Sequence, residues 1–257
     1  MGTRMIRDRS NMGGWWLMLA LFTLCVGGWS LAFACKAGAS EAPESFVGTA
    51  DRVWQVSEFN RISVAGSMDV QLVQGAAEAV YGRGDSTDLE RLEVVVQGRE
   101  LIIRRKRRIG FSGWFDDEVN LVITYRDLSS LSLSGSGELM ADSLTSEALS
   151  LRVSGSGDIE IDELSADTLE LSISGSADVT LAGSVEDQRV NISGSADYAA
   201  DNLQSVSAWV RISGSADALI HASDSLDAKV SGSGSVRYAG SPAVSRRVSG
   251  SGEIRAL

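Results

Sequence analysis

The tripeptide Ser-Gly-Ser recurs seven times in the second half of the chain, and its spacing constrains the fold more than any other feature. Successive central glycines are 20, 20, 19, 20, 18 and 18 residues apart. One structural unit is therefore repeated along the chain. Such a protein offers an extended surface of similar turns more readily than a single reactive cluster. The seven glycines are Gly135, Gly155, Gly175, Gly194, Gly214, Gly232 and Gly250.

Each copy also alternates apolar and polar residues. Around Gly155, every odd position from Leu149 to Ile161 is apolar or glycine. Because successive side chains of a strand point to opposite faces, the odd positions are expected to be buried and the even ones exposed. Equivalent residues contact each other only when the copies stack in parallel and in register. The sequence thus predicts an all-β, right-handed parallel β-helix (β-solenoid) with about 18–20 residues per coil over residues 128–257.

The repeated glycine is expected to form a corner between two strands. A small residue follows two positions later in every copy, Gly157 and Ala177 for example. Small residues allow the backbone to bend sharply while it packs closely against the next coil. The two serines on either side of the glycine should then form exposed ladders along the outside of the corner.

Residues 48–127 lack the repeat but keep the alternation, so we expect a less regular N-terminal β region that continues or caps the solenoid. Ala65-Gly66-Ser67 resembles a degenerate first copy of the corner. One helical turn is predicted at residues 86–92, with Ser86 or Thr87 as N-cap. The expected strands cover residues 53–56, 62–64, 70–73, 92–96, 101–105 and 119–125.

The first 35 residues are typical of a signal peptide or a membrane or lipid anchor. Arg4, Arg7 and Arg9 precede an uncharged, largely apolar stretch that ends in Ala32-Phe33-Ala34-Cys35. Three interpretations remain open: lipidation of Cys35, plain cleavage before Cys35, and retention as an uncleaved anchor. Each of them places the rest of the chain, after a linker at residues 36–47, in the extracytoplasmic bacterial envelope, at the periplasm or the outer membrane surface. The membrane is an expected partner of this segment alone.

Charge and composition exclude several classes of function. The chain has a net charge of −11, and residues 128–257 contain 8 basic and 18 acidic residues. A surface of that sign repels nucleic acid, so no nucleic-acid partner is expected. Cys25 and Cys35 are the only cysteines, and His221 is the only histidine. Metal clusters of His and Cys and triads that depend on His are therefore excluded, and we expect neither catalytic residues nor a cofactor.

Acidic residues recur just after the corner and form the most suggestive polar pattern. Ser235 interrupts this series, which Glu253 then resumes. Stacked carboxylates repel one another unless cations or basic neighbours compensate. We expect turn-forming acids with exposed ion pairs to basic residues on the other side of the corner, such as Arg152, Arg211 and Lys229, and no metal. A column of bound cations is the alternative, and it would use Glu138, Asp158, Asp178, Asp197 and Asp217.

Residues 104–118 contain the strongest charge run of the chain. Five basic residues precede three aromatic ones, and Asp116-Asp117-Glu118 follows. The segment is either an interaction tip that contacts headgroups or glycans, or a cap over the end of the solenoid. Trp209 stands at an outward position, where it could stack on a sugar ring or be covered by a loop. The tip residues are Arg104, Arg105, Lys106, Arg107, Arg108, Phe111, Trp114 and Phe115.

Residues 53–257 resemble the head GIN domain family of putative autotransporter adhesins. The resemblance rests on residues 59–70, on the serial Leu-x-Leu-Ser-Gly-Ser-Gly/Ala-Asp/Glu copies, and on the closing stretches at residues 236–242 and 248–252. It implies a right-handed β-helix carried by exported or lipidated bacterial surface proteins, with an adhesin label and no catalytic residues.

These observations predict an exported, non-enzymatic surface or periplasmic interaction module, adhesin-like, whose partner is an unknown surface protein or glycan. One alternative is a β-helix protein that binds or cleaves polysaccharide, since similar coils can carry a groove on one face. The other alternative is a self-assembling envelope scaffold.

Overall fold

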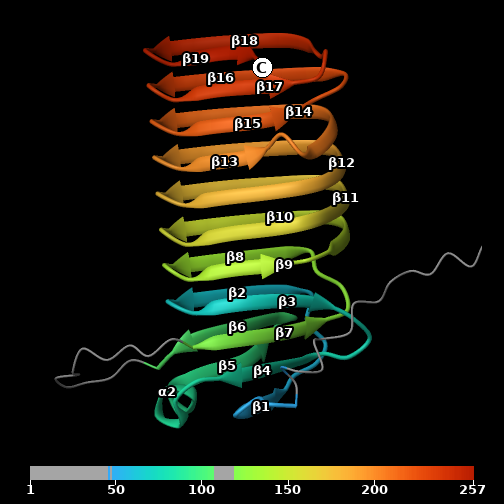
Figure 1. Cartoon of the computed structure of the whole chain (residues 1–257), viewed down its shortest axis with the longest axis vertical. Coiled ribbons are helices and arrows are strands. Elements are labelled where there is room, and N and C mark those ends of the chain that lie inside the picture. The colour runs from blue at the N-terminus through green and yellow to red at the C-terminus, as the bar shows by residue number, and fades with distance from the viewer. Residues whose placement is uncertain (1–45, 47, 107–118) are drawn as a thin grey trace, which may run out of the picture. The chain divides into compact units, whose positions relative to one another are not determined.

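The computed structural model describes residues 46, 48–106 and 119–257. Their strands form one continuous hydrogen-bonded sheet that winds into stacked coils (Figure 1). The predicted right-handed parallel β-solenoid is confirmed. The leader at residues 1–35, including Cys35, and nearly all of the linker lie outside the described residues. Within the described ranges, no helix is long and apolar enough to cross a membrane.

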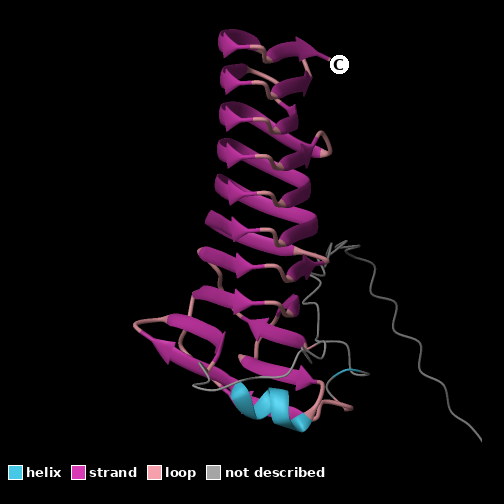
Figure 2. Ribbon diagram, turned by 90° about the vertical axis from the view of Figure 1, so that its left-hand side faces the viewer, coloured by secondary structure: helices cyan, strands magenta, loops and turns pink. Residues whose placement is uncertain are grey.

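Each coil of the repeat consists of a strand that ends at the Ser-Gly-Ser corner and a strand that begins just after it. Corresponding strands of successive coils stack on one another (Figure 2). They pair in parallel and in the same register, so that Gly155 lies between Gly135 and Gly175. The strands of these coils are β8 (Ser130–Gly135), β9 (Glu138–Ala141), β10 (Leu144–Gly155), β11 (Asp158–Gly175), β12 (Asp178–Gly194), β13 (Asp197–Ala200), β14 (Leu203–Gly214), β15 (Asp217–His221), β16 (Ser225–Gly232), β17 (Ser235–Ala239), β18 (Ala243–Gly250) and β19 (Glu253–Ala256).

The corner separates two faces of the solenoid. We call the surface of the residues that lead into the corner on β8, β10, β11, β12, β14, β16 and β18 the first face. The residues that follow the corner form the second face, which begins on β9, β11, β12, β13, β15, β17 and β19. A short third side closes the coil, and there Leu164 pairs with both Leu144 and Gly183. The sequence predicted two strands joined at the corner and no third strand at this place.

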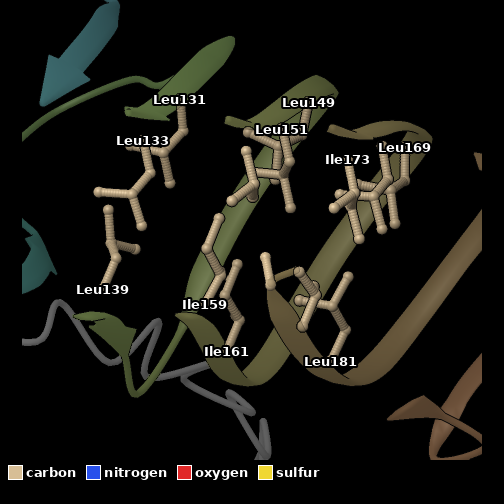
Figure 3. Close-up of a cluster of buried hydrophobic side chains, with 14 of the residues drawn as sticks. Leu131, Leu133, Leu139, Leu149, Leu151, Ile159, Ile161, Leu169, Ile173 and Leu181 are labelled. Carbon is tan, nitrogen blue, oxygen red and sulfur yellow. The ribbon is translucent and has the colours of Figure 1, made fainter. Parts of the chain in front are cut away.

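Apolar columns fill the interior, as the alternation predicted. Leu131, Leu151 and Leu171 are at most 1% exposed and pair with one another on successive strands. Figure 3 shows Leu131 and Leu151 on neighbouring strands. Leu133, Val153 and Ile173 form the next buried column, which lies closer to the corner. Burying such a side chain stabilises the fold by about 1.5–3 kcal/mol relative to leaving it exposed. The stacked coils are therefore held together mainly by like-on-like apolar contacts.

The corner glycines are required by the backbone itself. Gly175 has a φ of +142°, a conformation that L side chains rarely adopt. A Cβ atom at this position would lie 2.0 Å from the carbonyl oxygen of Gly155 in the coil before it. The flanking Ser174 and Ser176 are exposed, so the predicted serine ladders do run along the outside.

The one 19-residue step of the repeat has a structural cause on the third side. The register between β11 and β12 shifts between Ile161 and Leu164, because three steps from Ile161 to Leu164 face two steps from Leu181 to Gly183. Gly183 has a φ of +120°, and a Cβ there would lie 2.2 Å from the oxygen of Leu164. Gly183 thus allows this coil to be one residue shorter, and the strands pair in register again after it.

A polar group replaces leucine in one inner column. Gln188 pairs with Leu169 but is itself only 1% exposed. Its side chain donates to the hydroxyl of Ser205 at 2.7 Å and to the carbonyl of His221 at 3.1 Å, and it accepts a bond from Tyr198 at 3.2 Å. Because each of these polar groups is buried with a partner, the cluster ties the first face, the second face and the third side together.

The N-terminal part of the chain builds the opposite end of the stack. Strand β2 pairs in parallel with both β6 and β8, and β3 pairs with both β7 and β9. The degenerate copy at Gly66 is thus a genuine coil that lies between a later coil and the repeat. The elements of this part are β1 (Arg52–Gln55), β2 (Arg61–Gly66), β3 (Asp69–Gln74), β4 (Ala79–Arg83), α2 (Ser86–Arg91), β5 (Leu92–Gln97), β6 (Glu100–Arg105) and β7 (Asn120–Tyr125).

Three pairs of strands in this part are antiparallel. Strand β4, which the sequence did not predict, pairs with β1 and β7, and β5 pairs with β6. The helix α2 begins at Ser86, and its N-cap is Asp85 instead of the expected Ser86 or Thr87. The Asp85 side chain accepts a bond from the backbone N–H of Thr87 at 2.7 Å. That bond, with the side-chain bond to Thr87, holds the pKa of Asp85 below its ordinary value.

Candidate interaction groove

A groove of about 850 Å³ runs along the first face of the solenoid. It crosses β10, β11, β12, β14, β16 and β18, which follow one another along the stack (Figure 1). Its polar lining comes from three neighbouring columns of outward positions. The residues are Asp187, Ser207 and Ser225 in the first column, Ser150, Glu170, Arg189, Trp209, Asp227 and Ser245 in the second, and Arg152, Ser172 and Asn191 in the third.

The middle column carries the most varied residues. Strand register places Arg189 between Glu170 and Trp209, and Trp209 between Arg189 and Asp227. Unlike the corner positions, these outward positions do not approach another coil's backbone, so the repeat leaves their side chains free to differ. A repeated scaffold thereby presents a row of side chains that is not itself repeated.

Ion pairs join neighbouring coils beside the groove. Arg189 and Glu170 lie 4.0 Å apart with both side chains more than half exposed, and Arg211 lies 4.0 Å from Asp227. The Arg152 guanidinium donates to the hydroxyl of Ser130 at 3.4 Å. Exposed pairs of this kind contribute only about 0–1 kcal/mol each. Arg152 and Arg211 were expected to pair across the corner with the acidic column, but the partners found here, Ser130 and Asp227, lie on the first face.

Trp209 lies in the middle of the groove and is half-buried. The guanidinium carbon of Arg211 is 4.3 Å from the centre of its ring, a cation–π contact that holds the indole in place. The two residues are two apart on β14 and therefore point to the same side of the sheet. The sequence indicated the outward position of Trp209 but not the groove around it.

The acidic column after the corner exists as predicted, on the second face. Asp158 pairs with Glu138, and Asp197 pairs with both Asp178 and Asp217. The Asp158 carboxylate accepts a bond from the backbone N–H of Asp178 at 3.0 Å, and Asp217 accepts bonds from the N–H and hydroxyl of Ser235 at 3.1 and 2.6 Å. Across residues 46, 48–106 and 119–257, no group of three or more His, Cys, Asp or Glu could hold a metal ion. The carboxylates thus bond to the neighbouring coil.

The predicted interaction tip falls only in part within the described residues. Arg104, Arg105 and Lys106 lie at the end of β6 and just after it. Arg104 donates to Glu93 on β5 at 2.8 Å, and this bond holds the pKa of Glu93 below its ordinary value. The remaining tip residues, Arg107, Arg108, Phe111, Trp114 and Phe115, lie outside the described residues.

Strand register nevertheless shows where the tip segment is inserted. Ala65 pairs with Arg104, and Asp69 pairs with Asn120. Residues 105–119 therefore stand in the chain where the neighbouring coil has only Gly66, Ser67 and Met68.

Comparison with known proteins supports the fold and gives a family. The family model described as "Putative auto-transporter adhesin, head GIN domain" matches residues 58–242. No curated protein matches the chain.

Solved structures from Bacteroides and Parabacteroides species have the same fold. A putative adhesin from Bacteroides fragilis is 24% identical with a TM-score of 0.74, and a putative adhesin from Parabacteroides distasonis is 25% identical with a TM-score of 0.62. A structure from Parabacteroides distasonis described as a putative lipid binding protein is 23% identical with a TM-score of 0.66. Each alignment covers 80% of this chain and 95% of the other.

Proposed function

The chain belongs to the putative auto-transporter adhesin, head GIN domain family, and we propose that it is an exported, non-enzymatic interaction module of the bacterial envelope. The groove on the first face is its contact surface. Its family and the similar structures are described as adhesins or as lipid-binding proteins, not as enzymes.

One observation carries this proposal: the varied outward residues of the first face line one elongated hollow. The groove spans six strands of the stack and combines an aromatic ring with charged and hydroxyl side chains. Mixed surfaces with one rigid aromatic anchor are typical of recognition sites. The corner, by contrast, repeats nearly the same residues from coil to coil. The second face combines the acidic column with one varied outward column, which consists of Met140, Glu160, Thr180, Ala199, Leu219, Arg237 and Arg255.

The proposal also includes the cellular location of the protein. We propose that Cys35 carries the anchor that holds the module at the envelope. The test is metabolic labelling with a fatty-acid probe of cells that express the wild-type chain or Cys35→Ser. Label in the wild type that disappears in the variant is the expected result, whereas an unlabelled wild type would eliminate the lipid anchor.

The contact surface is tested by filling the groove in the full chain. Asn191→Trp places a large side chain on the groove wall, and Thr180→Trp places the same side chain on the exposed second face of the same strand. Cells that display each variant are compared for adhesion to other bacteria, to mucin and to lipid-coated surfaces. We expect adhesion to fall for Asn191→Trp alone.

Two results would contradict the proposal. Equal adhesion of both variants would remove the groove as the contact surface. Turnover of any offered polysaccharide by the purified full chain would overturn the non-enzymatic role and favour a polysaccharide-cleaving β-helix.

A further inference from the structure

We propose that the groove binds a segment of an uncharged polysaccharide, with the indole of Trp209 as the platform on which one sugar ring stacks. This inference rests on the proposed function and names the class of ligand. It is carried by four properties of the groove: the placement of the indole, the balance of charge, the nature of the exposed apolar surface and the length of the hollow.

The indole is held in advance in a position suited to stacking. Trp209 is half-buried, and its column neighbours Arg189 and Asp227 lie one coil away on either side. Arg211 contacts the ring at 4.3 Å and lies 4.0 Å from Asp227, so the indole has a fixed partner on the sheet. Trp209 is one of the residues that line the groove. A ring already held in place loses little conformational entropy when a ligand covers it.

The charges of the groove cancel, which favours an uncharged ligand. Arg152 and Arg189 line it together with three acidic residues, and Arg211, which covers the indole, supplies a third cation. The acidic residues are Glu170, Asp187 and Asp227. An acidic polymer or an anionic lipid headgroup would meet as many like charges as opposite ones. Sugar hydroxyls, by contrast, both donate and accept hydrogen bonds, and this lining offers guanidinium donors beside carboxylate acceptors.

The apolar side chains of the lining that reach the surface are the indole of Trp209 and the methyl group of Ala243. Leu171, Ala208 and Leu226 also border the groove, but each is at most 4% exposed because it points into the core. An acyl chain would therefore find little apolar surface beyond one ring. A sugar ring needs only that, because its apolar face stacks on an aromatic side chain while its rim forms hydrogen bonds.

The length of the hollow favours a chain over a single sugar. The middle column runs from Ser150 to Ser245 in five coil-to-coil steps. At about 4.8 Å between neighbouring strands, these steps span about 24 Å. A groove of this length and about 850 Å³ accommodates several consecutive rings. The polymer would lie along the axis of the solenoid, across the strands.

The test measures binding of the purified full chain to immobilised and soluble polysaccharides. Neutral probes are β-glucan, xylan, galactomannan and dextran. Alginate and polygalacturonate serve as acidic probes, and vesicles of phosphatidylglycerol and phosphatidylcholine serve as lipid probes. We expect binding to at least one neutral polysaccharide that persists at high salt, since no net charge is exchanged.

Three substitutions locate the platform. Trp209→Ser gives the residue that other coils carry in this column and should weaken binding at least about tenfold, whereas Trp209→Phe should weaken it less because a ring remains. Leu219→Ser removes a half-exposed apolar side chain from the second face of the same coil and should leave binding unchanged. Thermal unfolding of each variant confirms that the loss is not a loss of fold.

The outcomes separate this inference from the proposed function. Unchanged binding in Trp209→Ser, binding of acidic polymers or vesicles alone, or no binding to any neutral probe would each overturn the inference. If the adhesion of displaying cells still falls for Asn191→Trp, the groove remains the contact surface, and only the ligand class is wrong.

Discussion

The corner and the groove belong to the same repeat, yet one is uniform and the other is not. Seven Ser-Gly-Ser copies occupy the corner, whereas the middle column of the groove holds Glu170, Arg189, Trp209 and Asp227 in successive coils. At the corner, any Cβ would meet the backbone of the neighbouring coil. In the groove, side chains point to solvent. Repetition is thus imposed where coil touches coil, and variety is permitted where the surface is free.

The largest effect is expected from a substitution that disrupts the corner. Gly175→Ala adds a Cβ 2.0 Å from the oxygen of Gly155 at a φ of +142°, so it should lower the free energy of unfolding by more than about 3 kcal/mol. Ser172→Ala, at an exposed groove position of the same strand, should change it by less than about 0.5 kcal/mol. Denaturant unfolding of the two variants measures the contrast, and similar losses would refute it.

A smaller effect is expected beneath the groove, in the buried polar cluster. Gln188→Leu leaves the Tyr198 hydroxyl and the Ser205 hydroxyl without this partner, which should cost about 2 kcal/mol. Adding Tyr198→Phe should restore part of the loss, because both members of one hydrogen bond are then apolar. Strictly additive losses in the double variant, measured by denaturant unfolding, would show that the two side chains are not coupled.

Two buried tyrosines should make the fold sensitive to alkali. Burial raises the pKa of Tyr125 and Tyr198 above their ordinary value. The folded state then retains protons that the unfolded state releases. The contribution of the two tyrosines to stability is therefore constant below about pH 10 and falls as the pH rises further, by about 1.4 kcal/mol per pH unit for each tyrosine. Unfolding measured across this range should show a shallower slope for Tyr198→Phe. An unchanged slope would contradict the assignment.

The smallest effect is expected from cations at the acidic column. The carboxylates of Asp158 and Asp217 already accept bonds from the next coil, so calcium should not shift the thermal midpoint of the protein. Differential scanning calorimetry with calcium and with a chelator tests this. A rise of the thermal midpoint with calcium that is lost in Asp178→Asn would support the alternative in which the acidic column binds cations.

Most of the architecture could be predicted because it depends on the spacing of the repeat and on the alternation of inward and outward residues. The step between glycines fixed the coil length, and the alternation around Gly155 identified the inner columns. Strand β4 escaped prediction because Gly82 interrupts a short apolar run, although the structure explains that glycine: a Cβ there would lie 2.7 Å from the ring of Trp54. The third side escaped because Leu144, Leu164 and Gly183 share no motif.

The groove could be predicted only in fragments. The sequence gives the outward parity of Trp209, but a hollow depends on the sizes of side chains from six strands that are about 20 residues apart. The contact of Arg211 with the indole and its approach to Asp227 likewise depend on rotamers and on strand stacking. The exact partners of the basic residues were therefore beyond sequence reasoning, which had placed them across the corner.

The stacking order at the N-terminal end affects the order of assembly during synthesis. The β2–β3 coil lies between a coil supplied by β6 and β7 and another supplied by β8 and β9. One edge of residues 61–74 therefore stays incompletely paired until the chain has emerged as far as residue 125, and the other edge until it has emerged as far as residue 141. A chain delivered N-terminus first must keep this segment soluble while it waits, so a chaperone would be needed most for the earliest strands and least for the later coils, which can add one by one.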